Sequence, residues 1–203
     1  MDDRTYWDER YRDATFRLPE EPSRPLREFA DALPEGRAFD VATGTGRNAL
    51  FLAAAGYEVD AVDVSGVGLD EARERAAERD LDGHVDWIQA DLDTYCVPES
   101  AYDVVSVSFY RALELLPDLK EALAPGGVLC YEHHLRSPEA DRGPSDDRHR
   151  FRSNDLLRAV LDLTVLHYEE TTRVEDGRTS AVATIVARNT GGGSQTYPRR
   201  PAE

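Results

Sequence analysis

A chain of 203 residues is long enough for one α/β domain that buries a sizeable core without disulfides or metal. Its 40 acidic and 24 basic residues give a formal net charge of -16, which excludes a broadly basic surface, so we expect no nucleic-acid partner. No apolar run approaches the roughly 18 residues of a membrane helix. The acidic residues 1–4 are also unlike a signal peptide, so we expect a cytoplasmic protein with no membrane partner.

The distribution of charge indicates adaptation to salt. Lys120 is the one lysine in the sequence, and the acidic residues are spread along the whole chain. Such a coat of solvated carboxylates is typical of a halophilic protein and needs no specific partner. Strong salt also screens phosphates, which weakens the argument against polyanions. Cys96 and Cys130 have no His or Cys cluster around them, so we predict neither a zinc site nor a disulfide framework, and no bound metal.

The first part of the chain predicts two helices. Trp7 and Tyr11 belong to an aromatic set at helical spacing, which predicts a short helix over the first dozen residues. Three prolines between positions 19 and 25 end it, and residues 26–33 predict a second helix. We interpret residues 1–36 as an N-terminal helical lid or cap.

Apolar segments then alternate with helical patterns as far as residue 132. Nearly continuous apolar strands are buried on both faces, which is typical of a parallel sheet covered by helices. We therefore predict an α/β fold with five parallel strands. The predicted strands cover residues 38–42, 57–63, 85–88, 103–108 and 128–132. The predicted helices cover residues 48–55, 69–77 and 112–123, and Pro117 opens a second segment of the last one.

The last part of the chain changes character. The polar, proline-containing residues 136–150 predict an excursion over the active face. Ser153 is the predicted N-cap of a helix over residues 155–163. Two final strands, residues 164–171 and 180–187, should pair antiparallel through a turn that contains Asp-Gly.

The domain boundaries follow from these elements. Residues 37–189 form the main domain that follows the N-terminal cap. Residues 190–203 contain three consecutive glycines and little apolar content, so we predict a disordered tail.

The strongest chemical signal is a glycine-rich turn behind the first predicted strand, with the sequence DVATGTG at residues 40–46. Gly44 and Gly46 let the backbone turn tightly and approach a ligand at a helix N-terminus without a Cβ clash. The turn by itself also fits a dinucleotide fingerprint, because Asp63 lies where a ribose-binding carboxylate belongs. An NAD-binding oxidoreductase therefore stays open at this point.

Three further features resemble the class I S-adenosylmethionine-dependent methyltransferases. These are Asp40 at the end of the first strand, Asp91 after the third, and the turn APGG at residues 124–127 before the fifth. The resemblance covers residues 40–187 and implies a Rossmann-like fold. Its sheet is mostly parallel and seven-stranded, with a C-terminal antiparallel hairpin and helices on both faces.

Within this superfamily, two segments narrow the resemblance. The opening residues 6–11 and the loop at residues 143–152 look like the tellurite-resistance and thiopurine methyltransferase group. The implied cofactor is S-adenosyl-L-methionine, and the implied product is S-adenosyl-L-homocysteine.

The resemblance also implies site residues. Asp40 would lie beneath the methionine ammonium group, Asp63 would accept hydrogen bonds from the ribose hydroxyls, and Asp91 with Leu92 would border the adenine. Carboxylates suit a cationic cofactor that offers vicinal hydroxyls. Two alternatives stay open: Asp91 only caps a helix, and the aromatic helix only staples itself to the body. The implied cofactor-binding set is Asp40, Gly44, Gly46, Asp63, Val64, Asp91, Leu92, Ser108, Trp7 and Tyr11.

Methyl transfer depends mainly on positioning, and a general base is needed only for an acceptor that is protonated at working pH. His133 and His134 follow the fifth strand at the edge where ligands bind, and adjacent residues point apart, so at most one faces the site. We take His133 as the candidate catalytic residue. The alternative is that both rings only satisfy loop carbonyls.

A local concentration of positive charge lies at residues 148–152. Guanidinium groups suit a small oxyanion or carboxylate, so we take Arg150 as a candidate for contact with an anionic acceptor. The alternative is that these arginines pair with acidic residues nearby.

These features predict a methyltransferase that acts on a small molecule, such as a thiol, a chalcogen oxyanion or another small nucleophile, a quinone precursor included. One alternative is a non-catalytic module that binds S-adenosylmethionine. The other is the NAD-binding oxidoreductase, which leaves the hairpin unexplained. We expect a monomer or a homodimer.

Overall fold

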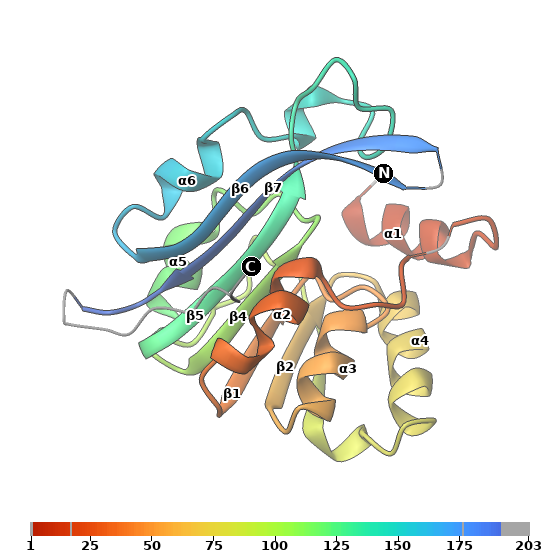
Figure 1. Cartoon of the computed structure of the whole chain (residues 1–203). Helices are drawn as coiled ribbons and strands as arrows, with labels where there is room; N and C mark the ends of the chain where they lie inside the picture. The colour runs from red at the N-terminus through yellow and green to blue at the C-terminus, as the bar shows by residue number, and fades with distance from the viewer. Residues whose placement is uncertain (1, 17, 176, 192–203) are drawn as a thin grey trace.

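The computed structural model describes residues 2–16, 18–175 and 177–191 (Figure 1). The described residues form a sheet of seven strands in the order β3-β2-β1-β4-β5-β7-β6. The strands are β1 Arg37–Val41, β2 Glu58–Asp63, β3 Val85–Gln89, β4 Tyr102–Ser108, β5 Leu123–His134, β6 Thr164–Glu175 and β7 Arg178–Arg188. From residue 192 on, the predicted tail lies outside the described residues.

The pairing of the strands confirms the predicted fold. Strands β1 to β5 pair only in parallel with one another, whereas β7 pairs antiparallel with both β5 and β6. The five parallel strands need crossover connections, and the long β6–β7 hairpin closes one edge of the sheet. The carboxyl ends of β1, β2, β4 and β5 therefore meet at one edge.

Helices cover both faces of this sheet, as predicted (Figure 1). The helices are α1 Asp3–Arg12, α2 Arg24–Phe29, α3 Arg47–Ala54, α4 Gly66–Ala77, α5 Leu116–Glu121 and α6 Asp155–Ala159, with short 3-10 turns at Ala30–Ala32, Asp82–His84 and Asp147–His149.

The core consists of two layers because successive strand residues point to opposite faces. Val104 packs with Leu26 of α2 and Leu52 of α3 on one face. The next residue, Val105, packs on the other face in the cluster that contains Leu119 of α5. Each fully buried aliphatic side chain of this kind contributes about 1.5–3 kcal/mol.

The predicted helix over residues 112–123 is wrong in its bounds. Helix α5 begins only at Leu116, because the loop before it is held by the backbone amide of Ala112, which donates to the Tyr131 hydroxyl at 2.8 Å. The APGG turn lies inside β5, where it forms an irregularity in the pairing with β4. Gly126 takes a φ of 88° there, a left-handed conformation that suits glycine.

The predicted cap at Ser153 is also wrong. Asn154, with a φ of 65°, stands at the N-cap of α6, and the helix ends at Ala159 rather than residue 163. The carboxylate of Glu170 on β6 draws the chain away from the predicted cap, since it accepts bonds from the Ser153 hydroxyl and the Asn154 amide, both at 2.6 Å.

We expect Tyr131→Phe to destabilise the fold. Tyr131 is fully buried, and its hydroxyl donates to the carbonyl of Tyr110 at 2.7 Å while it accepts from the amide of Ala112. Loss of the hydroxyl leaves two buried backbone groups unpaired, so the free energy of unfolding in urea titrations should fall by about 1–3 kcal/mol. The control Tyr6→Phe, on an exposed ring, should stay within about 0.5 kcal/mol of wild type. Equal effects of the two variants would contradict this role.

Candidate active site

The glycine-rich turn joins β1 to α3 and has no room for side chains at its two glycines. Gly44 and Gly46 take φ values of 57° and 80°. A Cβ on Gly46 would lie 2.8 Å from the ring of Trp87, and one on Gly44 would lie 2.7 Å from the hydroxyl of Tyr11. Gly46 is also the N-cap of α3, so the free amides of that helix point into the turn.

Asp40 lies at the carboxyl end of β1, directly beneath this turn, and is fully buried. Its Oδ2 accepts a hydrogen bond from the Thr43 hydroxyl at 2.5 Å, whereas its Oδ1 has no hydrogen-bond partner among the described residues. Burial raises the pKa of Asp40 to about 6, although the bond from Thr43, the nearby Ser106 hydroxyl, the charge of Arg47 and the nearby Asn48 amide oppose this shift. An unpaired buried carboxylate oxygen fits a cationic donor from a ligand.

Asp63 ends β2 and ties the neighbouring loops together. Its carboxylate accepts from the amide of Gly44 at 2.7 Å and from the amide of Ser65 at 2.9 Å. Burial raises the pKa of Asp63, and these backbone bonds oppose the shift. The next residue, Val64, is half-buried, and its carbonyl accepts from Gln89 at 3.2 Å.

Asp91 and Leu92 follow β3 and differ in exposure. Leu92 is buried in the core, whereas Asp91 is exposed and its carboxylate accepts from the amide of Asp93 at 3.0 Å. The observed bond closes a local turn, and the described residues between β3 and β4 contain no helix for Asp91 to cap. Ser108 ends β4, and its hydroxyl accepts from Asn48 of α3 at 3.1 Å.

Helix α1 lies beside α4, at the end of the molecule where the glycine-rich turn is found (Figure 1). Trp7 and Tyr11 stack with ring centroids 5.8 Å apart, and the Tyr11 ring lies against the turn. The carboxylate of Asp8 accepts from the Ser65 hydroxyl at 2.6 Å and from the amide of Val67 at 3.3 Å. No described residue of α1 is fully buried, and Trp7, Asp8 and Tyr11 are half-buried against the rest of the protein.

His133 and Arg150 both support the loop between β5 and α6. Nε2 of His133 donates to the carbonyl of His149 at 2.8 Å, and burial lowers the pKa of this ring to about 4. Arg150 donates to the carbonyls of Pro144, Leu135 and Arg142 at 2.8–3.2 Å. The alternative for His133, that the ring satisfies a loop carbonyl, describes the observed contact. Arg150 is buried and binds carbonyls rather than the acidic residues of its own alternative.

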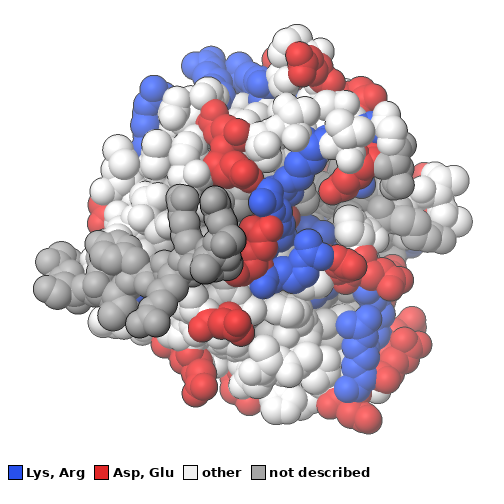
Figure 2. Space-filling view, viewed as in Figure 1, with Lys and Arg blue, Asp and Glu red and all other residues white. Residues whose placement is uncertain are grey.

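Sequence reasoning missed a set of charged residues at the same edge. Glu132 on β5 lies between Arg47 of α3 and Arg173 of β6. Figure 2 shows basic side chains gathered near the middle of this face, with acidic side chains around them. A buried acid within an apolar strand, and an arginine directly after Gly46, were the available signals. Neither signal predicted which basic residue would pair with Glu132.

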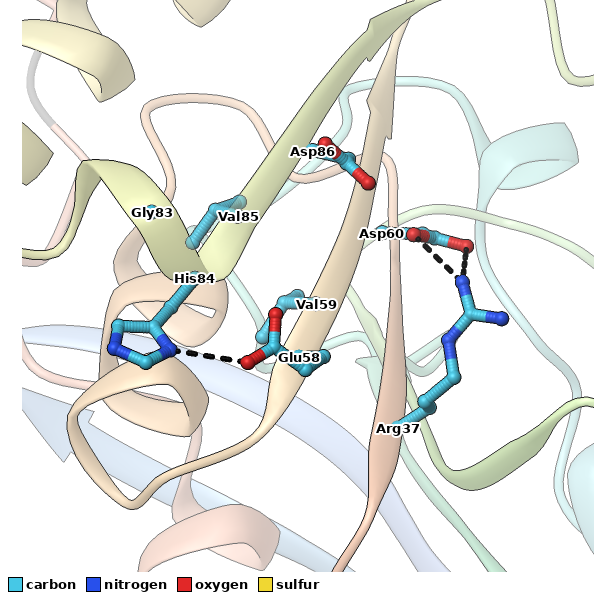
Figure 3. A pocket seen from close by; sticks show the side chains of 8 residues that line it. All are labelled: Arg37, Glu58, Val59, Asp60, Gly83, His84, Val85 and Asp86. Atoms are coloured by element: carbon cyan, nitrogen blue, oxygen red, sulfur yellow. Dashed lines mark hydrogen bonds and ion pairs between the residues drawn. The ribbon is translucent and has the colours of Figure 1, made fainter.

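A polar cavity of about 370 Å³ lies elsewhere, at the amino ends of β1, β2 and β3 (Figure 3). Its charged groups pair with one another: His84 with Glu58 at 3.2 Å, and Arg37 with Asp60 at 3.1 Å. Ligands of open parallel sheets bind at the carboxyl ends of the strands, so this cavity is not the candidate site. Its lining is Arg37, Glu58, Val59, Asp60, Gly83, His84, Val85 and Asp86.

Two features are absent from residues 2–16, 18–175 and 177–191. Within these ranges, no helix is both long and apolar enough to cross a bilayer. The same ranges contain no group of three or more side chains that could together ligate a metal ion.

Comparison with known proteins gives partial matches to methyltransferases. Residues 38–127 match the family described as methyltransferase domain. The ubiquinone/menaquinone biosynthesis C-methyltransferase UbiE of Rhodopseudomonas palustris (strain BisB5) is 34% identical over 107 residues, which are 47% of this chain and 42% of the relative. The chain thus matches less than half the length of this curated relative.

The fold is shared with solved methyltransferase structures. TehB from Haemophilus influenzae superposes with a TM-score of 0.71 at 18% identity, over 92% of this chain and 66% of that one. A geranyl diphosphate C-methyltransferase from Streptomyces coelicolor A3(2), solved with S-adenosyl-L-homocysteine, has a TM-score of 0.68 at 15% identity, over 92% and 96%. The chain therefore shares the fold of class I methyltransferases, and residues 38–127 match the methyltransferase domain. This result favours the methyltransferase over the oxidoreductase that the glycine-rich turn left open.

The buried carboxyl of Asp40 predicts a pH-dependent stability. Its folded-state pKa is raised from 3.8 to about 6, so the folded protein binds this proton more tightly than the unfolded chain. The resulting stabilisation is present below pH 3.8 and is lost as the pH rises through about 6. Asp40→Asn, whose amide mimics the neutral acid, should exceed wild type by about 3 kcal/mol at pH 8 and about 2 kcal/mol at pH 5.5 in urea unfolding without cofactor.

The matched control is Asp86→Asn, an exposed carboxyl on β3, which should show no such pH-dependent difference. An Asp40→Asn protein that is less stable than wild type at both pH values would mean that the charged form is the favoured one.

Proposed function

We propose that the protein is an active S-adenosylmethionine-dependent methyltransferase, and that its acceptor is a small molecule whose nucleophile is already ionised at neutral pH, such as a thiolate or a chalcogen oxyanion. One observation carries the proposal: the unpaired, buried Oδ1 of Asp40 lies beneath a turn that Asp63 holds at the next strand end. The fold and the family match support the cofactor assignment.

The residues fit this cofactor in chemical terms. Asp40 would face the ammonium group, Gly44 and Gly46 would let the backbone approach the methionine part, and Asp63 would accept the ribose hydroxyls. The rest of the cofactor would be bordered by Asp91, Leu92, Val64 and Ser108. Leu92 supplies apolar surface, while Asp91 would have to turn from its present bond with the Asp93 amide to reach an adenine amine.

The bound cofactor supplies a methyl group whose bond to sulfur breaks with both electrons staying on that sulfur, while a lone pair of the acceptor forms the new bond. The protein must orient the acceptor and exclude water. It offers only weak bases here, because burial lowers the pKa of His134 to about 3 and of His133 to about 4. An acceptor that needs no proton removed fits these histidines better than a carbon acceptor does.

We also propose that α1 is a lid over the cofactor. Trp7 and Tyr11 form its aromatic face, and Tyr11 already lies against Gly44. Asp8 would hold the lid closed, because its carboxylate accepts hydrogen bonds from Ser65 and Val67 at the start of α4. We call these two hydrogen bonds the latch. Burial and the nearby charge of Asp63 raise the pKa of Tyr11, so its hydroxyl stays neutral.

The cellular compartment and the oligomeric state are also proposals. A net charge of -16 with a single lysine supports a salt-rich cytoplasm as the working compartment. The monomer or homodimer expected from the sequence remains our proposal for the assembly.

Titration calorimetry tests the cofactor site. Wild type should bind S-adenosylmethionine and S-adenosylhomocysteine but not NAD, and Asp63→Ala should bind both at least about 30-fold more weakly because a charge-assisted acceptor is lost. Asp63→Asn keeps one acceptor oxygen for the Gly44 amide, so its affinity for both compounds should lie between those of wild type and Asp63→Ala. Asp86→Ala on β3 is the exposed control and should bind like wild type.

A folded wild-type sample that binds neither adenosyl compound would disprove the proposal. Binding without any S-adenosylhomocysteine production from thiols, selenite or tellurite would instead favour the non-catalytic module.

The lid has its own optical probe, since Trp7 and Trp87 are the two tryptophans of the sequence. In a Trp87→Phe background, S-adenosylhomocysteine should shift Trp7 emission to shorter wavelength as water is excluded. Asp8→Ala should weaken binding roughly 3–10-fold, because the latch bonds to a charged group are lost. Glu9→Ala, an exposed neighbour on α1, should bind normally. An unchanged Trp7 spectrum on binding would indicate a staple rather than a lid.

A further inference from the structure

Two arginines converge on one buried carboxylate beside the proposed cofactor site. Glu132 on β5 is 2% exposed. Nη2 of Arg47 lies 3.8 Å from its Oε1, and Nη1 of Arg173 lies 3.3 Å from its Oε2. We refer to Arg47 and Arg173 as the arginine pair. The two residues come from α3 and β6, which are far apart in the sequence and meet only in the folded protein.

The arginine pair adjoins the place where methyl transfer would occur. Arg47 directly follows Gly46, and its charge interacts with Asp40. Glu132 stands in register with Ser108 at the end of β4. The pair therefore lies on the acceptor side of the glycine-rich turn.

With the proposed cofactor bound, the charges around the arginine pair would not balance. Two guanidinium groups face one carboxylate, which leaves one positive charge, and the side chains of Arg47 and Arg173 are only 11% and 19% exposed. Asp40 is the other carboxylate near Arg47, but the proposed cofactor brings an ammonium group to Asp40. His134 is neutral because burial lowers its pKa to about 3. A buried excess of positive charge is unfavourable unless a ligand neutralises it.

The arginine pair also has donors to spare. Charge-assisted bonds in proteins are usually about 2.7–2.9 Å long, and both contacts to Glu132 are longer. Nε of Arg173 is buried and has no hydrogen-bond partner among the described residues. Its Nη2 donates to the Thr184 hydroxyl at 3.1 Å, which orients the guanidinium plane.

An apolar surface completes the arrangement. The ring centroid of Phe109 lies 5.7 Å from the guanidinium of Arg47 and 4.6 Å from the ring centroid of His134. Phe109 is 37% exposed and takes a φ of 57°, a strained conformation for a bulky residue. Its position is thus imposed by the surroundings, and it presents an aromatic face next to the positive charge.

We propose that the arginine pair binds an anionic group of the acceptor that is separate from the methylated atom, and that Phe109 covers the planar or apolar part between the two. The acceptor is therefore a small molecule with a nucleophile and a carboxylate or comparable oxyanion. The transfer step rests on the proposed methyltransferase function, whereas anion binding at the arginine pair does not.

Benzoate, which cannot be methylated at sulfur, tests the binding step by calorimetry on the complex with S-adenosylhomocysteine, at constant salt. Wild type should bind benzoate, and Arg173→Gln should lose at least tenfold in benzoate affinity while its affinity for S-adenosylhomocysteine stays within twofold. Glu132→Gln should bind benzoate several-fold more tightly, because the competing carboxylate is gone. Arg142→Gln, at a half-buried arginine paired with Glu175, is the matched control and should behave like wild type.

A second experiment measures methyl transfer to two thiol acceptors. Wild type should show a KM at least tenfold lower for para-mercaptobenzoate than for para-thiocresol, which lacks the carboxylate, and Arg173→Gln should remove this preference with little change in kcat. Arg47→Gln and Arg173→Gln could instead weaken the binding of S-adenosylhomocysteine and leave the binding of benzoate unchanged. In that case the arginine pair binds the cofactor carboxylate and the proposal is wrong. Absent benzoate binding by wild type also overturns it, whether or not methyl transfer is observed. Conversely, benzoate binding without transfer would refute only the proposed activity.

Discussion

The carboxylate of Asp63 holds the loops of the candidate site in place. It accepts the Gly44 amide of the first loop and the Ser65 amide of the second. Ser65 in turn accepts from the amide of Gly68 to begin α4 and donates to Asp8 of α1. One short chain of hydrogen bonds therefore connects two strand ends, a helix start and the N-terminal helix. The bonds accepted by the carboxylates of Asp63 and Asp8 are stronger than neutral ones and give the turn a defined shape.

The same edge of the sheet contains buried charged groups that are not fully paired and therefore do not stabilise the fold. Asp40 is fully buried with one oxygen unpaired, and the arginine pair holds more positive charge than Glu132 neutralises. Buried polar groups are normally satisfied, so exceptions gathered at one strand edge indicate a place built for ligands. The two exceptions have opposite sign. A cationic cofactor near Asp40 and an anionic group near the arginine pair would together balance the edge.

The chemistry of the acceptor follows from which side chains are free to act. The two adjacent histidine rings do not point apart as expected, because their centroids lie 5.9 Å from each other in an edge-to-face contact. His133 binds a loop carbonyl and His134 packs against Phe109. Burial lowers the pKa of both rings, so neither is matched to proton transfer near neutral pH. In the proposed reaction, orientation and electrostatics are then the means left to the protein, so the charges beside the acceptor would matter more than a base.

The sequence by itself determined the order of strands and helices, the parallel sheet with its final hairpin, and the glycine-rich turn with Asp40 and Asp63. Those features depend on local patterns: apolar runs, left-handed glycines and an acid at a strand end. Helix bounds near Ala112 and Ser153 were wrong because Tyr131 and Glu170, distant in the chain, bind the backbone there. Arg150 was expected at the acceptor but binds three loop carbonyls, and only the tertiary structure brought Arg47, Glu132 and Arg173 together. A sequence shows which residues are charged, whereas the partner of each charge depends on strand pairing across the sheet.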